Sequence, residues 1–340
     1  MLEPEIVAFV ERTKALYPGD RSASTVVEQR AMYERLAAAF TPPLPDGVRT
    51  HDAPFTSPDG HTFMLRLYAP AQRERCERSP GMVLYFHGGG FVVGSLASHD
   101  LITARIAADT GLCVIAVDYR LAPEHPAPAA HGDCLAVTRA ALDGRLPFGP
   151  LPTSLQLAGD SAGATLAASV AMRLRDEGVK GVRGLALVYP MLGVEPQSPA
   201  RETEAEAPML TLADVRRYSA TYWGDEGGNR ASNEAGNADS ADSGIGGMRA
   251  SVSAHIAWTI PLEASRYDGL PPTLAIGVEH DPLRDDARVF AERIRAAGGQ
   301  AHAPVGKGLV HGSWRALATS PGVRWMHGEV CRFLADHAAD

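Results

Sequence analysis

One serine lies between two glycines in the stretch GDSAG, residues 159–163, where an apolar segment gives way to a run of small residues. A strand that turns sharply into a helix strains the residue at the turn, and only small neighbours such as Gly159 and Gly163 leave room for it. The turn would hold the Ser161 hydroxyl at the carboxyl edge of a sheet, beside the positive end of a helix. The pattern is that of a nucleophile elbow, and it predicts that Ser161 attacks a carbonyl carbon.

Three consecutive glycines follow His87, directly after the apolar run Met82–Phe86. Glycines in such a number weaken any regular element, but they allow backbone N–H groups to approach a ligand closely. We therefore predict an oxyanion hole made by the N–H groups of Gly88, Gly89 and Ala162, the last being the residue after the serine. A plain flexible turn is the alternative interpretation.

A serine nucleophile needs a general base, and in folds with such an elbow the chain order is serine, acid, histidine. His311 lies in GLVHGSW, after a predicted final strand at 301–305, and its flanking glycines let the ring reach the edge of the sheet. We predict that His311 is the base. The other histidines are placed inside that strand, beside the acid candidate, or on the surface of the last helix (His302, His280, His327 and His337).

The acid is expected directly after the preceding strand, predicted at 274–278. Asp281 fits this place, where it would hold the tautomer of His311 and stabilise the imidazolium. Because Pro282 is a favourable first helical residue, Asp281 could instead cap the following helix. Asp285 and Asp286 fall in the first helical turn, and we assign them to stabilisation by the helix dipole.

The elements that would position these residues alternate along the chain. Two alternating segments, 47–55 and 61–69, predict an antiparallel hairpin. Short runs that are apolar on both faces predict strands of a buried parallel sheet, at 82–86, 113–117, 155–158, 185–189 and 274–278. Helical patterns fall at 3–16, 24–40, 98–110, 127–143, 162–177, 283–298 and 321–337. The predicted fold class is α/β, and the candidate site residues all fall at carboxyl ends of strands, where ligands bind.

Composition excludes several other classes of function. The 340 residues carry a formal charge of −8 and no basic stripe, which argues against nucleic-acid binding. No apolar run is long enough for a membrane span, and the acidic early N-terminus does not resemble a signal peptide, so a cytoplasmic location is expected. The four cysteines show no metal or redox spacing and are predicted to be reduced thiols. We expect no metal and no cofactor.

The chain resembles the bacterial hormone-sensitive-lipase-like esterases, which are α/β-hydrolases of the acetyl esterase and carboxylesterase type. The resemblance is carried by HGGGF (87–91), VDYRLAPEHPAPAA (117–130), GDSAG (159–163), LPP (270–272), DPLRD (281–285) and HG (311–312). It implies a mostly parallel sheet with a helical cap, the triad Ser161, Asp281 and His311, and the same oxyanion hole. It also implies that Arg120 and Glu124 brace the loop under the active site. Ser313 departs from the family, where a bulky aromatic residue is commoner, and Trp314 could compensate.

The resemblance further implies a division of the chain into four parts. Cap helices are expected at 1–42 and a second cap segment at 191–224, with the hydrolase core at 43–190 and 255–340. Residues 225–254 are rich in Gly, Asn, Ser and Asp, which predicts a mobile insertion that is either a dispensable surface loop or a flap over the substrate. Relatives of this kind are often dimers, so a homodimer is an expectation.

The predicted function is hydrolysis of short- to medium-chain acyl esters through an acyl-enzyme. An amidase or a deacetylase of a specific small molecule could use the same triad, and a non-catalytic small-molecule receptor on this fold is a further alternative. The candidates for the substrate pocket are eight apolar and aromatic residues: Phe91, Tyr119, Leu192, Met209, Leu210, Tyr218, Tyr222 and Trp223. Ordinary core packing is the alternative role for each of them.

Overall fold

The computed structural model describes residues 1–340 except 18–23, 71–75, 77–78, 194–198, 225–257 and 339–340. The predicted insertion at 225–254 therefore lies outside the described residues. Among the described helices, none has the length and apolar character that crossing a membrane requires.

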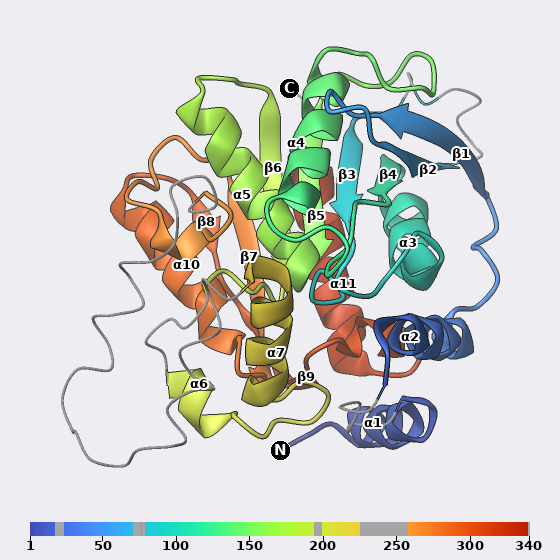
Figure 1. The fold of residues 1–340 in the computed structure, drawn as a ribbon, viewed down its shortest axis with the longest axis vertical. Coiled ribbons are helices and arrows are strands. Elements are labelled where there is room, and N and C mark those ends of the chain that lie inside the picture. The colour runs from blue at the N-terminus through green and yellow to red at the C-terminus, as the bar shows by residue number, and fades with distance from the viewer. Residues whose placement is uncertain (18–23, 71–75, 77–78, 194–198, 225–257, 339–340) are drawn as a thin grey trace.

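A central sheet organises the described part of the chain, with the strand order β1-β2-β4-β3-β5-β6-β7-β8 and with β9 paired to β7 (Figure 1). The strands are β1 (Val48–Thr56), β2 (Thr62–Pro70), β3 (Met82–Phe86), β4 (Cys113–Val117), β5 (Leu155–Asp160), β6 (Val182–Val188), β7 (Thr273–His280), β8 (Ala301–His302) and β9 (Val305–Val310). The first two strands form the predicted antiparallel hairpin, and β2 pairs antiparallel with β4. All pairings from β4 through β9 are parallel, which confirms the predicted α/β class.

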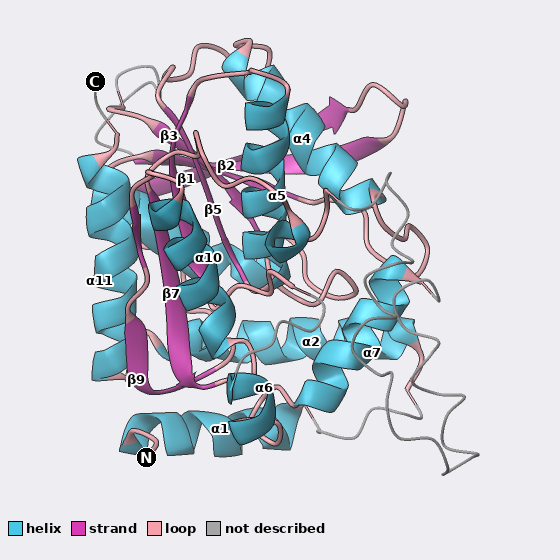
Figure 2. Ribbon diagram, turned by 90° about the vertical axis from the view of Figure 1, so that its left-hand side faces the viewer, coloured by secondary structure: helices cyan, strands magenta, loops and turns pink. Residues whose placement is uncertain are grey.

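Two hydrophobic cores cover the two faces of the sheet, because successive residues of a strand point to opposite sides. In β3, Met82, Leu84 and Phe86 enter one core, and Val83 and Tyr85 enter the other. The first core is completed by α4 (Ala129–Leu142), α5 (Ala162–Asp176) and α10 (Arg284–Ala296). The second is completed by α3 (Asp100–Thr110) and α11 (Pro321–Asp336). Figure 2 shows α11 on the opposite side of the sheet from α5.

Four more helices lie together at the end of the sheet where β7 terminates (Figure 2). They are α1 (Pro4–Leu16), α2 (Val26–Phe40), α6 (Pro199–Thr203) and α7 (Leu212–Trp223). Two of them begin with a capping box, made by Thr25 with Glu28 in α2 and by Thr211 with Asp214 in α7. Two helices near the N-terminus and two helices that follow β6 thus cover the carboxyl edge of the parallel strands.

Three sequence-based predictions about these elements are wrong. The strand predicted at 301–305 is two strands, β8 and the longer β9, because pairing with β7 outweighs the low strand propensity of the glycines in that region. Cys76 and Cys113 form a disulfide, whereas Cys134 and Cys331 are free. The sequence spacing of Cys76 and Cys113 did not indicate a disulfide, because the two thiols are brought together by the fold and not by a short separation along the chain. His327 is buried, not on the surface.

Candidate active site

Ser161 occupies the sharp turn between β5 and α5 in a strained backbone conformation, with φ 52° and ψ −120°. The two flanking glycines are required by crowding against the end of β3. A Cβ at Gly163 would overlap the carbonyl of Phe86, and one at Gly159 would lie 2.6 Å from the same oxygen. Strain of this kind typically costs about 1–3 kcal/mol and persists only where the surrounding structure imposes it. The turn therefore fixes the direction in which the serine hydroxyl points.

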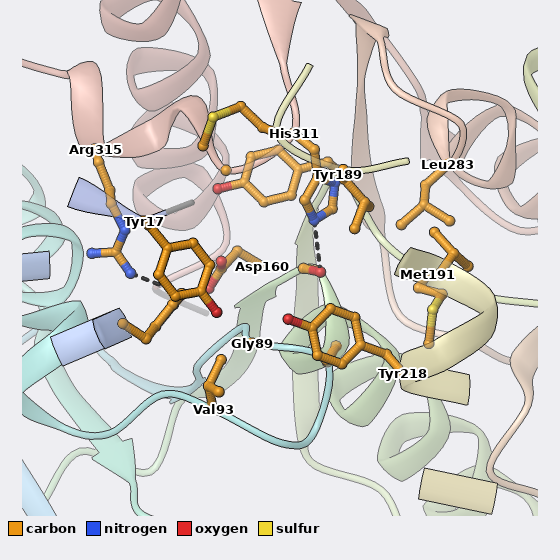
Figure 3. A pocket seen from close by; sticks show the side chains of 18 of the residues that line it. Tyr17, Gly89, Val93, Asp160, Tyr189, Met191, Tyr218, Leu283, His311 and Arg315 are labelled. Carbon is orange, nitrogen blue, oxygen red and sulfur yellow. Dashed lines mark hydrogen bonds between the residues drawn. The ribbon is translucent and has the colours of Figure 1, made fainter. Parts of the chain in front are cut away.

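The structure brings the three predicted triad residues into direct contact, and the dashed line at His311 in Figure 3 marks its hydrogen bond to Ser161. The Ser161 Oγ lies 2.8 Å from Nε2 of His311, and Nδ1 of His311 lies 2.7 Å from Oδ2 of Asp281. A carboxylate accepts from Nδ1–H, which leaves the Nε2 lone pair directed at the serine hydroxyl. This is the tautomer in which His311 can take a proton from Ser161.

Each triad partner is held by its own surroundings. Asp281 is fully buried, and its Oδ1 accepts the backbone N–H of Leu283 at 2.8 Å, so the local turn fixes the carboxylate. The ring of His311 packs against Tyr189 with centroids 4.7 Å apart. Gly312 after it has φ 72°, a left-handed conformation that glycine adopts without strain. Asp281 thus holds the turn before α10 and is the partner of the histidine. It is not the N-cap of α10, which is Leu283, so the alternative role as a helix cap is wrong.

The glycine loop corrects one predicted oxyanion donor. The N–H of Gly88 donates to Oδ1 of Asp160 at 3.0 Å, and Gly88 does not line the cavity, so it is not directed at an oxyanion. Gly89 and Gly90 do line it, and among the described residues their N–H groups have no acceptor. Ala162 is the first residue of α5, where an N–H has no partner within the helix. The geometry therefore favours Gly89, Gly90 and Ala162.

Asp160, which had no role in the sequence-based predictions, holds the glycine loop through the backbone of Gly88. Its Oδ1 accepts the Tyr85 hydroxyl at 2.6 Å in addition to the N–H of Gly88. Burial alone would raise the pKa of Asp160, but His99 and Tyr85 beside it lower that pKa to about 2. Asp160 is therefore ionised and orients the glycine loop. Its position directly before the nucleophile was the only signal available in the sequence.

The residues around His87 explain why Tyr119 is buried behind the glycine loop. The Tyr119 hydroxyl donates to the His87 carbonyl at 2.5 Å, and the two rings stack with centroids 4.3 Å apart. Burial lowers the pKa of His87 to about 3, so this histidine stays neutral and takes a structural role. Tyr119 supports the loop and does not line the cavity.

The run after β4 makes the bracing contacts that the resemblance implied. Arg120 donates to the buried Asp133, with Nη2 at 2.7 Å from Oδ1. Glu124 pairs with Arg30 of α2 through two hydrogen bonds of 2.8 and 2.6 Å. Arg120 therefore ties the loop to α4, and Glu124 ties it to an N-terminal helix.

A cavity of about 110 Å³ opens beside Ser161. Residues of α1, α2, α7 and the adjoining loops form its apolar walls: Phe9, Tyr17, Tyr33, Leu36, Met191, Met209, Leu210, Val215, Tyr218 and Leu283. Three of the eight predicted pocket residues are among them, namely Met209, Leu210 and Tyr218. Arg315 also lines the cavity, and the sequence reasoning missed it.

The other five pocket predictions are wrong, since Phe91, Tyr119, Leu192, Tyr222 and Trp223 do not line the cavity. Phe91 stacks on Tyr222 with centroids 3.9 Å apart, and Trp223 packs edge-on against both. These aromatic residues join α7 to the core. Sequence alone cannot separate aromatic residues that fasten a cap to the core from those that face a ligand.

Asp286 has a larger part than the helix-dipole role assigned from the sequence. Its Oδ2 accepts the backbone N–H of Leu192 at 2.9 Å, and it pairs with the buried Arg201 at 3.1 Å. Burial raises the pKa of Asp286 to about 6, against the opposing effect of Arg201. Asp285 likewise accepts the N–H of Ala200 at 3.0 Å. The helix that follows Asp281 thus anchors the segment that enters the cap.

One group of potential metal ligands lies outside this site, on the far face of the sheet. The ligand atoms of Asp109, His327 and Cys331 lie within 4.8 Å of one another. However, Trp314 donates its indole N–H to Nδ1 of His327 at 3.2 Å, so Nε2 carries the ring proton and faces Asp109 at 2.9 Å. A metal at Nε2 would require an imidazolate, and burial raises the pKa of Cys331 to about 12. The cluster is therefore best described as a hydrogen-bonded network.

Comparisons with known proteins found a family, curated relatives and solved structures that match most of the chain. A family model described as the alpha/beta hydrolase fold matches residues 83–315. The chain is 33% identical over 284 residues to the esterase LipI of Mycobacterium tuberculosis, covering 83% of this chain and 80% of that protein. It is 29% identical to the ethyl acetate hydrolase of Pseudomonas putida, covering 91% of each. A solved hyperthermophilic esterase of the archaeon Pyrobaculum calidifontis superposes with a TM-score of 0.82 at 26% identity, over 99% of both chains.

Proposed function

The chain belongs to the α/β-hydrolase-fold family and is a carboxylic ester hydrolase, and on that premise we propose that Ser161 is its nucleophile, His311 its general base and Asp281 the acid that orients the histidine. The observation that carries the proposal is the unbroken contact from Asp281 through His311 to Ser161 at the wall of the cavity. The named relatives support the reaction, and the geometry supports the residues.

Acylation begins when Nε2 of His311 takes the proton of the Ser161 hydroxyl as Oγ attacks the ester carbonyl carbon. The carbonyl oxygen becomes an oxyanion and accepts hydrogen bonds from the N–H groups of Gly89, Gly90 and Ala162. Asp281 stabilises the imidazolium through its bond to Nδ1. The C–O bond to the alcohol then breaks, the leaving oxygen takes the proton from Nε2, and an acyl-serine remains.

Deacylation repeats these steps with water as the nucleophile. His311 takes a proton from the water, the hydroxide oxygen attacks the acyl carbon, and the same N–H groups bind the new oxyanion. Collapse breaks the bond to Oγ, and Ser161 regains its proton as the carboxylic acid leaves. Every proton transfer passes through Nε2, which is why the tautomer held by Asp281 matters in both halves of the cycle.

We also propose that residues 1–42 and 191–224 form a cap that limits the length of the acyl chain. Phe9 and Leu36 from the first segment and Met191 and Leu210 from the second bound a cavity of about 110 Å³. Long acyl chains would have to displace these packed side chains. Short- to medium-chain esters are therefore the proposed substrates, with a cytoplasmic location and a homodimer as further expectations.

A chain-length series tests the substrate range. We expect kcat/KM for p-nitrophenyl esters to peak at acyl chains of about 2–8 carbons. It should fall for longer chains, because a pocket bounded by packed side chains has no room for the additional carbons. The matched p-nitroanilide of the best acyl group serves as the second arm. A maximum at long acyl chains would contradict the proposed cap, and comparable kcat/KM for the anilide would favour the amidase alternative.

A further inference from the structure

A buried guanidinium lies in the wall of the cavity. Arg315 belongs to the short 3₁₀ helix η5 (Ser313–Ala316), four residues after the catalytic histidine candidate, and is only 7% exposed. Its Nη1 donates to the carbonyl of Ser98 at 2.6 Å, and its Nη2 donates to the hydroxyl of Tyr33 at 2.9 Å. These bonds use two of the five N–H hydrogens that a guanidinium offers.

Within the described part of the chain, no carboxylate forms an ion pair with Arg315. A buried charge without such a partner is costly, and proteins usually provide a counter-ion for it. Asp160 lines the same cavity and acts on Arg315 electrostatically, but its Oδ1 is bonded to Tyr85 and Gly88 and lies 3.5 Å from Nε2 of His99. Among the residues that the structure describes, the guanidinium therefore has no direct anionic partner.

The one cationic side chain in the described lining of the cavity, Arg315, lies to one side of the serine. Figure 3 shows Arg315 and Tyr17 on one side of the contact between Ser161 and His311, and Met191 and Leu283 on the opposite side. An ester whose carbonyl sits at Ser161 extends its acyl and alcohol groups in different directions. One of the two groups then extends toward the side of Arg315, and the other extends toward the side of Met191 and Leu283.

We propose that Arg315 binds a carboxylate carried by one arm of the substrate, so that half-esters of short dicarboxylic acids are preferred over neutral esters of the same shape. This inference rests on the proposed function and names its substrate class. A carboxylate would complete the coordination of the guanidinium with charge-assisted hydrogen bonds. Burial raises the pKa of Tyr33, so its hydroxyl keeps the proton and remains a donor beside the same group.

The test compares two esters that differ only in this charge: monoethyl glutarate and ethyl 5-methylhexanoate, in which an isopropyl group replaces the carboxylate. Acid release in a pH-stat gives kcat/KM for each. We expect the wild-type protein to have a higher kcat/KM for the half-ester than for the neutral ester, whereas a purely apolar cavity would reject the half-ester. Arg315→Met should lower the ratio of the two kcat/KM values by about 10- to 100-fold, which is the usual effect of removing a charged hydrogen bond.

Two further variants make the result interpretable. Arg315→Lys keeps the charge and should retain part of the preference for the half-ester. If Arg315→Met does not fold, the ratio of the two kcat/KM values in Arg315→Lys tests the proposal in its place. Arg332→Met removes an exposed arginine on α11 that pairs with Glu329, and it should leave the ratio unchanged. Binding of the carboxylate by Arg315 predicts a change in the ratio, whereas a purely structural tie to α2 predicts an equal loss for both esters.

Three outcomes separate the claims. Equal losses for the two esters in Arg315→Met, or a wild-type protein that does not prefer the half-ester, would overturn the proposed substrate class and leave the esterase proposal intact. If the wild-type protein hydrolyses neither ester nor any p-nitrophenyl ester, the proposed function itself fails.

Discussion

Replacing Ser161 with alanine should lower kcat/KM for a short-chain ester by a factor of about 10⁴–10⁶. The reason is that Oγ is the atom that bonds to the acyl carbon, and no other hydroxyl can occupy its position in the turn. The fold should be almost unaffected, because among the described contacts the side chain makes one hydrogen bond, to His311. Initial rates and the midpoint of thermal unfolding would measure the two effects separately.

Ser169→Ala provides the matched control for this variant. Ser169 lies on the same helix, α5, is fully buried, and has no hydrogen-bond partner for its hydroxyl among the described residues. The Ser169→Ala variant is expected to keep the kcat/KM of the wild type. A Ser161→Ala protein that retained activity within tenfold of wild type would rule out Ser161 as the nucleophile.

Replacing His311 with alanine should reduce kcat/KM by a similar factor, because the serine proton then has no acceptor at 2.8 Å. The triad acts as one unit, so the double variant Ser161→Ala/His311→Ala should be no worse than either single variant. His302→Ala, at an exposed position on β8, is the control and should behave as wild type. Steady-state rates for the wild type and the four variants at one pH complete the comparison.

Additive losses in the double variant would mean that the two residues act independently, contrary to the contact seen between them. Near-normal activity in His311→Ala would move the role of base to another histidine. Among the described histidines, none besides His311 is hydrogen-bonded to Ser161.

The sequence was sufficient to predict the framework of the site. The elbow at Ser161 needs small neighbours, and Gly159 and Gly163 provide them. Asp281 and His311 each follow a strand of the sheet, and parallel strands end at one edge. Since these rules are local or topological, they predict the proposed triad without any knowledge of how side chains pack.

What the sequence could not predict depends on packing between distant segments. Gly88 and Gly90 are equivalent in a run of three glycines, and only the position of Asp160 shows that Gly88 is already bonded. Phe91 and Tyr222 have the size and character of pocket residues but stack on each other in the core. Arg315 follows the catalytic loop with no motif of its own, and its burial becomes visible only when Tyr33 of α2 is placed beside it.

The central claim is that the Ser161 hydroxyl is the nucleophile activated by His311. The most direct measurement is to treat the wild-type protein with a fluorophosphonate that phosphonylates activated serines and to locate the adduct by tandem mass spectrometry. We expect one adduct per chain, on Ser161, formed in proportion to the loss of esterase activity and absent from Ser161→Ala. Complete inhibition with the adduct on a different residue, or full activity loss with Ser161 unmodified, would contradict the account.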